Sequence, residues 1–444
     1  MARSFAVLIA LLLAPAGALA QSVGSAFSGP TTADGASAYW NPAAMAEGEG
    51  TMLEIDLGLS LLGASYAPDT IEGTSETNAV KPIATLGGFT DVLGEQFRLG
   101  LTVTVPQTTG GSWDRNDGAA DITRFYITDA AIFHVTATPA FSWSPTPWLT
   151  LGVGATVANG QFIVELDKDL GASINQTVGS DVVDSPLPYG SPELAAQTNL
   201  RAQGWGVGAV GGVIVRPVPE LSIGASIHSP VSITGSGTVD AVYPDSVNTI
   251  VNDVVPGAEL PDLSGDIEVD LTLPMNIYAA VAYRPSQRLE VAAEYRYINR
   301  ASQPSLLVDI TKATSNLVED AVLARAYRDQ HTVSLRGEYS VVDELRVALF
   351  GRYTNNTVPE NTTSPSTLDF TKWELGLAVR WQISQTVGIT AQYSHFIIPD
   401  TVVRNSLHRP LAQPSLATFN HPRPTGTYSV NADTFQLGAT FSFR

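Results

Sequence analysis

Near the end of the chain, the stretch "TFQLGATFSF" (residues 434–443) alternates strictly between two kinds of side chain. One parity is apolar and holds Phe435, Leu437, Ala439, Phe441 and Phe443. The other parity is polar or small and holds Gln436, Gly438, Thr440 and Ser442. Because successive side chains of a β-strand point to opposite faces, this stretch predicts a strand with one apolar face and one polar face.

The same alternation recurs upstream, in residues 288–297, 332–339, 345–353 and 372–381. Runs of this kind approach the roughly 9–11 residues that a tilted strand needs to cross a bilayer. Strands of a soluble β-sandwich, the alternative fold, usually have about 5–6 residues. Aromatic residues near the ends of the runs are typical of the girdles of membrane barrels: Tyr283, Tyr339, Tyr353, Trp373 and Trp381. The pattern favours an all-β fold, a transmembrane antiparallel β-barrel.

Short and long connections alternate along the chain. Six short, turn-like breaks occur at residues 90–95, 144–147, 216–220, 284–287, 341–344 and 384–386. Longer polar segments lie between them, notably residues 167–200, 240–264, 303–325 and 399–428. Outer-membrane barrels have tight periplasmic turns, long outer loops and an even strand number, so six turns predict about 14 strands. These strands form one barrel domain, residues 51–444.

The composition agrees with a membrane barrel. The net charge is -19, which argues against nucleic acid as a partner because its phosphates would repel the chain. Charged residues are 15% of the chain, compared with about 25% in soluble domains. There is no cysteine, and no stretch beyond the N-terminus resembles a membrane-spanning helix of about 18 apolar residues. An exported chain of this kind can enter a membrane as a closed β-barrel.

The first 20 residues predict a signal peptide. Arg3 precedes an apolar run at residues 5–13, and Ala18-Leu19-Ala20 forms a small-residue cleavage site. We therefore expect residues 1–20 to be removed on export, and the mature chain to reside in the outer membrane of a Gram-negative bacterium.

Residues 21–50 precede the first expected strand and predict a plug. A barrel of this size has a lumen wider than its own side chains fill. Asn41 can cap a short helix that begins at Pro42 and continues through Ala43. Taken alone, Asn-Pro-Ala is equally a common start of a helix after a turn. The motif "GVGAVG" (residues 206–211) lies inside a strand pattern, and we interpret its glycines as lumen-facing residues beside this plug.

Four stretches together resemble the FadL family, outer-membrane channels for long-chain fatty acids and aromatic hydrocarbons. They are "GSAFSGPTTADGASAYWNPAAMA" (24–46), "QGWGVGAVGGVIVRP" (203–217), "LSIGASIHSPVSITGSG" (221–237) and "LTLPMNIYAAVAYRP" (271–285). The resemblance covers nearly the whole chain, and Asn41-Pro42-Ala43 is its most specific part. It implies that residues 21–50 are a hatch inside the barrel, and that a break in the third strand lets substrate leave sideways into the membrane. Two departures are the final Arg444 after Phe443 and different loop sequences, which leave the substrate open.

The third strand, "QFRLGLTVTVPQTTGG" (96–111), contains a proline. Proline donates no hydrogen bond to a ladder and is confined to edges and bulges of sheets. We therefore expect a lateral opening formed by Pro106, Gln107, Thr108, Gly110 and Gly111. The alternative places Pro106 above the membrane, at the start of the following loop.

Five arginines have the parity of the lumen face and are candidates for binding an anionic head group: Arg296, Arg336, Arg346, Arg352 and Arg380. Glutamates share their strands and faces (Glu290, Glu294, Glu338 and Glu374), so internal ion pairing is the alternative role.

The expected function is passive uptake of a hydrophobic compound: a fatty acid, a hydrocarbon or a detergent-like lipid. The other expected partners are outer-membrane lipids, and the expected state is a monomer. A general porin for small polar solutes is the first alternative, since charged lumen residues suit a porin. A lipid hydrolase is the second, but the six histidines show no metal spacing and no pairing with a nucleophile. We expect no catalytic residues, no metal and no cofactor.

Overall fold

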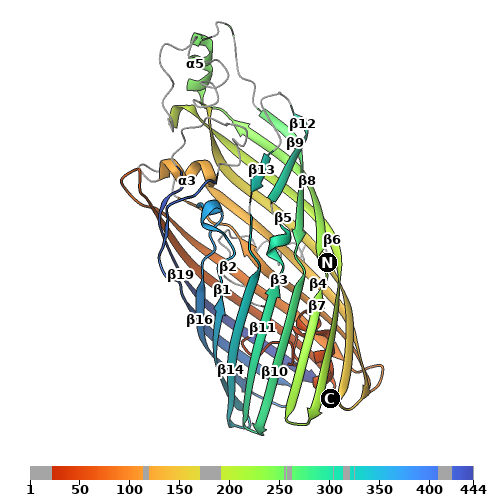
Figure 1. The fold of residues 1–444 in the computed structure, drawn as a ribbon. Coiled ribbons are helices and arrows are strands. Elements are labelled where there is room, and N and C mark those ends of the chain that lie inside the picture. Colours follow the sequence, from red (N-terminus) through yellow and green to blue (C-terminus); the bar gives the residue numbers. More distant parts are fainter. Residues whose placement is uncertain are drawn as a thin grey trace.

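The computed structural model describes residues 23–113, 120–170, 192–254, 257, 263–303, 305–313, 321–324, 326–408 and 423–443. The expected signal peptide, residues 1–20, lies outside these residues. Nineteen strand segments form a single sheet, and the ladders between the described strands are antiparallel (Figure 1). The sheet closes where β1 (Thr51–Pro68) pairs with β19 (Gly426–Phe443). Among the described residues, no helix has the length and hydropathy to cross a membrane.

The barrel has 14 wall strands, which confirms the predicted number. Besides β1 and β19, seven strands are continuous: β2 (Ser75–Thr90), β3 (Phe97–Thr109), β4 (Asp129–Thr146), β5 (Leu149–Asp169), β6 (Ala195–Val218), β15 (Leu345–Thr354) and β16 (Lys372–Gln382). Five further strands are each interrupted once: β7/β8 (Leu221–His228, Val231–Val242), β9/β10 (Leu263–Leu273, Asn276–Ser286), β11/β12 (Leu289–Ile298, Ser305–Ala313), β13/β14 (Ala321–Ala324, Gln330–Val342) and β17/β18 (Val387–Ile397, Thr401–Val403).

Tight turns close one end of the barrel, the end at which β19 finishes. All six turns predicted from the sequence connect neighbouring strands there, for example between β16 and β17 at residues 384–386. Longer connections lie at the other end. They contain α3 (Ala120–Tyr126), η2 (Pro192–Leu194), α5 (Asp245–Val254) and η4 (Glu360–Thr362), while η3 (Arg300–Ser302) interrupts the strand β11/β12.

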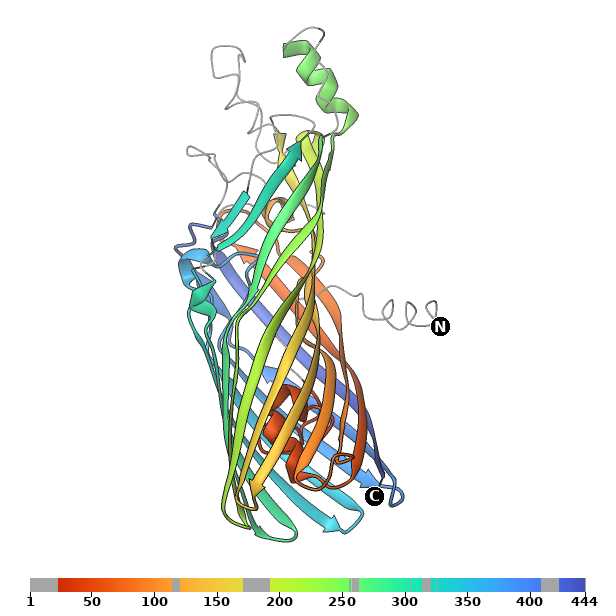
Figure 2. The ribbon, with the colours of Figure 1, turned by 90° about the vertical axis from the view of Figure 1, so that its right-hand side faces the viewer.

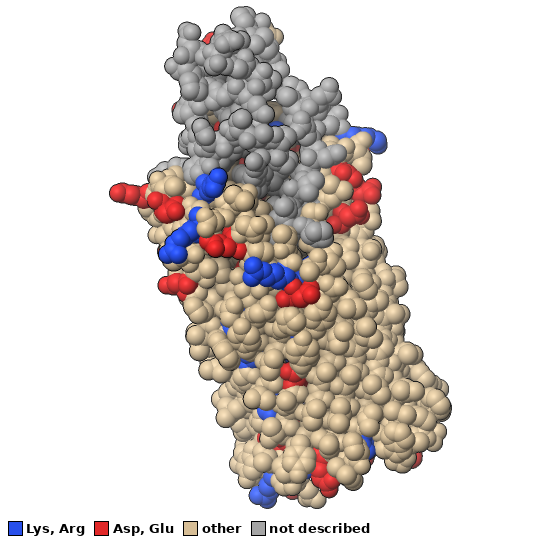
Figure 3. Space-filling view, viewed as in Figure 1, with Lys and Arg blue, Asp and Glu red and all other residues tan. Residues whose placement is uncertain are grey.

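The outer surface of the wall is apolar because the alternating residues point outward. Leu437 is 68% exposed, whereas its neighbour Gln436 is buried in the lumen. Aromatic residues predicted for the girdles, including Trp373, Trp381 and Tyr283, are exposed on the same surface. Figure 3 shows that charged side chains are sparse over the middle of the wall and gather toward its two ends. A surface of this kind suits contact with lipid.

The lumen is filled differently at its two ends. Near the tight turns it encloses the N-terminal segment, which we define as residues 23–50 and which contains α2 (Ser37–Trp40) and η1 (Pro42–Glu47) (Figure 2). Toward the long connections, apolar side chains from many strands form a buried cluster that includes Tyr66, Phe162, Leu166, Ile267, Phe370 and Tyr428. The barrel is therefore filled at one end by its own N-terminus and is apolar inside at the other.

Candidate functional site

Asn41 organises the N-terminal segment. Its side-chain oxygen accepts a hydrogen bond from the Ala43 N–H at 3.1 Å, and so caps η1, which begins at Pro42. Its side-chain nitrogen donates to the carbonyl oxygens of Pro30 at 2.8 Å and Val213 at 3.2 Å. One buried side chain thus starts the helix, closes the segment on itself and attaches it to β6.

Five glycines of the wall leave room for the N-terminal segment. A Cβ atom would lie 1.8 Å from the Gly35 oxygen if built on Gly87, and 2.2 Å from the Ala43 nitrogen if built on Gly152. Such distances are far too short for any side chain. We call these residues the glycine seat: Gly87 (β2), Gly100 (β3), Gly152 (β5), Gly212 (β6) and Gly224 (β7). Gly206 and Gly208 have the inward parity predicted for them, but an added Cβ would meet residues 229–233 and not the N-terminal segment. At Gly211 an added Cβ would meet no atom within 4 Å, so the predicted place beside the plug is wrong for these three glycines.

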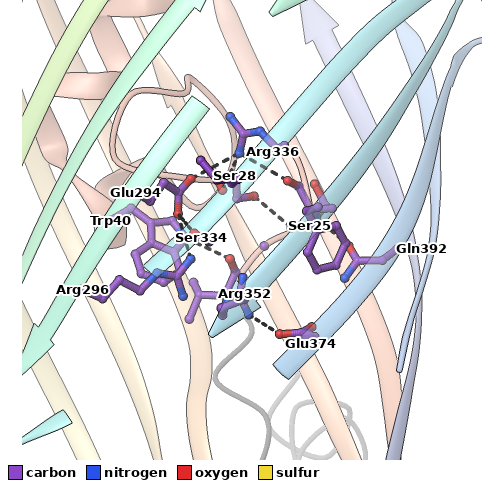
Figure 4. A pocket seen from close by; sticks show the side chains of 15 residues that line it. Ser25, Ser28, Trp40, Glu294, Arg296, Ser334, Arg336, Arg352, Glu374 and Gln392 are labelled. Atoms are coloured by element: carbon purple, nitrogen blue, oxygen red, sulfur yellow. Dashed lines mark hydrogen bonds and ion pairs between the residues drawn. The ribbon is translucent and has the colours of Figure 1, made fainter. Parts of the chain in front are cut away.

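Arginines hold the opposite side of the segment (Figure 4). The Arg336 guanidinium donates to the carbonyl oxygens of Ala26 and Ser28 and to the Thr32 hydroxyl, at 3.1–3.3 Å. Arg296 lies over the Trp40 ring at 4.2 Å, and Arg380 lies over the Phe27 ring at 4.5 Å. Cation–π contacts of this kind are strongest when they are shielded from water.

All five candidate arginines are paired with acidic residues of the wall. The shortest contacts join Arg352 to Glu374 at 2.6 Å, Arg336 to Glu338 at 2.9 Å and Arg296 to Glu294 at 3.1 Å. Arg380 is 3.6 Å from Glu54, and Arg346 is 3.3 Å from Glu338. Arg346 lies apart from the segment, and its side chain is 43% exposed. These pairings satisfy buried charges, as expected for ions inside a protein. A head-group role for the five arginines stays a prediction.

A pocket lies between the segment and the arginines. Its walls combine Ser25 and Ser28 of the segment with Glu294, Arg296, Arg336 and Arg352 of the barrel (Figure 4). Because this pocket is polar and charged, it suits water or a polar group better than a hydrocarbon chain.

The neighbouring strands β2 and β3 separate along part of their length. The ladder between β2 and β3 joins residues 85–90 to residues 99–104, although β2 extends up to Ser75. Beyond Thr104, β3 shifts register and follows β4. Within the described residues, the next pairing between the two edges is a single bridge from Thr77 to Trp113. We call the stretch of wall between this bridge and Thr85 the wall interval.

Prolines lie on both edges of the wall interval. Pro106 belongs to β3 and sits at its register shift. Pro82 belongs to β2 and lies in the stretch that pairs only with β1 in the described ladders. Proline cannot donate to a ladder, so it is suited to a strand edge without a neighbour. Sequence reasoning identified Pro106 but missed Pro82, whose signal was the same: a proline inside an alternating run.

An apolar cavity lies inside the barrel beside the wall interval. Thr77, Gly110, Gly111 and Trp113 line it from the two edges. Other lining residues come from β1, β19 and an inward-folded connection between β15 and β16: Leu62, Ala64, Val430, Leu368 and Phe370. Gly110 has φ +140°, and a Cβ there would lie 1.9 Å from the Ala130 oxygen, so glycine is required. The space is small, about 40 Å³, and its lining is mainly apolar, as in sites that bind hydrophobic ligands.

Charges at the rim of the cavity are compensated. Asp369 lines the cavity, and one of its carboxylate oxygens is 2.5 Å from the Lys372 ammonium. Its other oxygen accepts hydrogen bonds from the Thr357 N–H at 3.0 Å and hydroxyl at 2.5 Å. This carboxylate therefore fixes the inward-folded connection and offers no free charge to a ligand.

A buried carboxyl group joins the N-terminal segment to β1. Burial, together with the nearby Glu54 carboxylate, raises the pKa of Asp34 to about 7. Asp34 accepts hydrogen bonds from the Ala36 N–H at 2.8 Å and the Ser37 hydroxyl at 3.2 Å. Glu54 accepts one from the Gly35 N–H at 3.1 Å. Contact between segment and wall is therefore sensitive to the charge on Asp34.

The family model described as "Outer membrane protein transport protein (OMPP1/FadL/TodX)" matches residues 14–443. The chain belongs to this family. A structure of a Pseudomonas aeruginosa FadL homologue is 18% identical, with a TM-score of 0.78 over 98% of this chain and 99% of that one. The P. putida toluene transporter TodX is 15% identical, with a TM-score of 0.67 over 92% and 94%. The Ralstonia pickettii toluene transporter TbuX is 15% identical, with a TM-score of 0.63 over 94% and 98%. No curated protein matches the chain.

In this FadL-family barrel, the predicted site residues fall into two groups. Asn41, Pro42 and Ala43 lie in the N-terminal segment, against Gly152 of β5 and Gly212 of β6. Three of the five arginines, Arg296, Arg336 and Arg380, contact other residues of this segment. Pro106, Gln107, Thr108, Gly110 and Gly111 lie along one edge of the wall interval. The glycine seat and the inward-folded connection were not predicted. No group of three or more His, Asp or Glu in the described part of the chain could hold a metal ion.

Proposed function

We propose that this protein is a passive channel that takes up hydrophobic compounds across the outer membrane of a Gram-negative bacterium, and that it is not an enzyme. The observation that carries the proposal is the apolar cavity beside the wall interval. A hydrophobic molecule in that cavity lies next to the one stretch where the β2–β3 ladder is missing from the described wall. It can then pass sideways into the membrane, without entering the aqueous periplasm.

In this proposal, the N-terminal segment is a hatch that closes the periplasmic end. Support comes from the fit of its backbone on the glycine seat and from the three arginine contacts that hold Phe27, Trp40 and the carbonyl of Ser28. An occluded lumen argues against a general porin, which needs an open aqueous channel. Export would depend on a signal peptide at residues 1–20, and we propose that the barrel functions as a monomer.

We infer the class of ligand from the residues that line the apolar cavity and from the structures to which this chain is similar. Two similar structures are described as toluene transporters and another as a FadL homologue. The cavity of this chain is lined by aliphatic and aromatic residues, including Trp113 and Phe370. We therefore propose aromatic hydrocarbons, alkanes or fatty acids as ligands. Anchoring of an anionic head group by Arg296, Arg336, Arg346, Arg352 or Arg380 remains a prediction, beside the contacts that three of them, Arg296, Arg336 and Arg380, make with the hatch.

Sealing the wall interval tests the route. Tryptophan at Gln107 or Thr108 should lower uptake of radiolabelled toluene or laurate by about tenfold or more, because it obstructs the interval. Leu101→Trp is the matched control, since Leu101 lies on the lipid-facing side of the same strand where the β2 ladder is intact. Heat-modifiable migration on gels checks barrel assembly. Unchanged uptake through an obstructed wall would contradict the lateral route and indicate exit through the periplasmic end.

A further inference from the structure

The outer surface of the wall has a hollow that crosses four neighbouring strands: β16, β17, β19 and β1. Ala391 lies among larger apolar residues there, and its short side chain leaves the space between them: Leu57, Leu59, Leu377, Val379, Phe435 and Leu437. Leu57 is 59% exposed and Leu437 is 68% exposed, so the hollow opens to the outside of the barrel. Its volume of about 680 Å³ is in the range of sites that bind small molecules.

Polar side chains lie at the end of this hollow nearer the long connections. The Tyr393 ring lines the hollow and packs against the Phe435 ring at 5.0 Å, while its hydroxyl donates to the Asp433 carboxylate at 2.7 Å. The same carboxylate oxygen is 2.9 Å from Nδ1 of His395. No described residue donates to the other oxygen, and the Asp433 side chain is 38% exposed. One acceptor of this group is therefore open to a partner outside the barrel.

The depth of Asp433 places this group at the head groups of the outer leaflet. Ten residues separate Asp433 from Phe443, at the tight-turn end of β19. At about 3.4 Å per residue and a tilt near 40°, they rise roughly 25 Å, the height of the apolar band of such barrels. His395 is also close to the girdle residue Trp373, since the ladder pairs Trp373 with Ile397, the next outward residue of β17. A carboxylate on the outer surface is tolerated at this level, whereas deeper in the band it is costly.

Two amides lie next to these side chains on the same outer surface. The side-chain oxygens of Asn431 and Asn78 would lie 2.3 Å and 3.4 Å from a Cβ built on Gly63, so they approach one point. We define the outer polar cluster as Tyr393, His395, Asp433, Asn431 and Asn78. It holds no arginine or lysine, the residues that favour phosphate. Carboxylate, amide and hydroxyl groups instead match the hydroxyl and amide N–H groups of a sugar.

We propose that the hollow and the outer polar cluster form a binding site for a glycolipid of the outer leaflet. An acyl chain lies in the hollow, and an acylated amino sugar donates hydrogen bonds to Asp433. The hollow by itself accepts any acyl chain, so the cluster supplies the preference for a sugar over a phosphate head group. Because the site lies on the outside of the barrel, it does not depend on the route of a ligand through the lumen.

The test measures lipid binding to the intact barrel by native mass spectrometry in a mild detergent. The probes are a diacylated glucosamine without phosphate and phosphatidylethanolamine with the same two acyl chains. We expect the wild-type barrel to bind the glucosamine lipid about tenfold more tightly or better. Ala391→Phe fills the hollow and should lower this affinity by about tenfold. Ala293→Phe is the matched control, since Ala293 is an exposed alanine of β11, away from the hollow, and its change should leave the affinity unaltered.

A second set of variants tests the head group. Asp433→Leu removes the acceptor and should abolish the preference, so that the two lipids bind equally. Tyr393→Phe should reduce the preference by about threefold, because the carboxylate loses the hydroxyl that positions it. Tyr295→Phe is its control: the Tyr295 hydroxyl is 2.8 Å from His331 in a similar exposed pair on other strands.

Three outcomes would overturn the proposal. The first is equal affinity of the wild-type barrel for both lipids, or tighter binding of phosphatidylethanolamine. The second is an assembled Ala391→Phe barrel that binds the glucosamine lipid as the wild type does. The third is a preference that survives both Asp433→Leu and Tyr393→Phe. Heat-modifiable migration on gels checks assembly, and Tyr393→Phe carries the head-group test by itself if Asp433→Leu does not assemble.

Discussion

We expect single glycines to decide whether the N-terminal segment, the proposed hatch, fits in the barrel, and Gly152 offers the cleanest test. A methyl group at this position would meet backbone atoms of Pro42 and Ala43 at 2.2–2.5 Å, and backbone cannot rotate away as a side chain can. Overpacking of this kind costs about 1–3 kcal/mol. Gly152→Ala should therefore raise the fraction of barrels with a released hatch by about tenfold or more.

Ion conductance in planar bilayers measures this release. Gly211→Ala is the matched control, because no atom lies within 4 Å of the Cβ it would add on the adjacent strand. A Gly152→Ala barrel that stays as electrically tight as the control would show that the hatch does not depend on the glycine seat.

Asp34 should make the closure of the hatch depend on pH. In the docked hatch its pKa is about 7, whereas a released, solvated Asp34 titrates near its ordinary value of 3.8. The docked state thus binds the proton more tightly, so docking is strongest below about pH 4 and weakens as the pH rises toward 7. The charged and titratable groups that face Asp34 are Glu54 and Asp56 of β1, Arg380 of β16 and Arg336 of β14.

We expect wild-type conductance to be higher at pH 8 than at pH 5, and Asp34→Asn to flatten this difference. Asparagine keeps the acceptor for the Ala36 N–H and carries no charge at either pH. An Asp34→Asn barrel with the full pH dependence would assign the effect to other groups.

Among the structural elements, we expect the proposed hatch to be separable from the wall. The 14 strands close through the pairing of β1 with β19, which does not include the N-terminal segment. Deleting residues 23–46 should therefore leave a folded barrel. Since the deletion unplugs the lumen, the variant should conduct ions readily and lose selective uptake. A deletion variant that remains non-conducting would show that something else closes the channel.

The barrel as a whole should be nearly silent in a planar bilayer when intact. Its lumen is occupied near the tight turns by the hatch, and its other end is narrowed by a buried apolar cluster. A general porin of similar size conducts continuously. Steady conductance by the intact protein at pH 5, comparable with that of a porin, would refute the proposed closure.

The local sequence was enough to predict the wall. Side chains of a strand alternate between its two faces, and in a membrane barrel the apolar face is stable only against lipid. The alternation of Phe435, Leu437 and Ala439 therefore shows which residues face lipid. Turn residues at positions such as 384–386 fix where strands end. The cap at Asn41 could also be predicted from the local sequence, because a capping side chain accepts a hydrogen bond from a backbone N–H two or three residues further along the chain.

The site depends on residues that the tertiary structure brings together. Gly152 and Ala43 are distant in sequence. Nothing local distinguishes a glycine of the seat from Gly211, where an added Cβ would meet no atom within 4 Å. Pro82 lies on an edge of the wall interval because β3 stops pairing with β2 at Thr104 and continues along β4. The local sequence does not show this. The alternation of a strand shows only which residues face the lumen. It does not show which of these residues contact the hatch, which line the cavity and which lie on the wall interval. Closure of the barrel decides that, because it sets which distant strands face each other across the lumen.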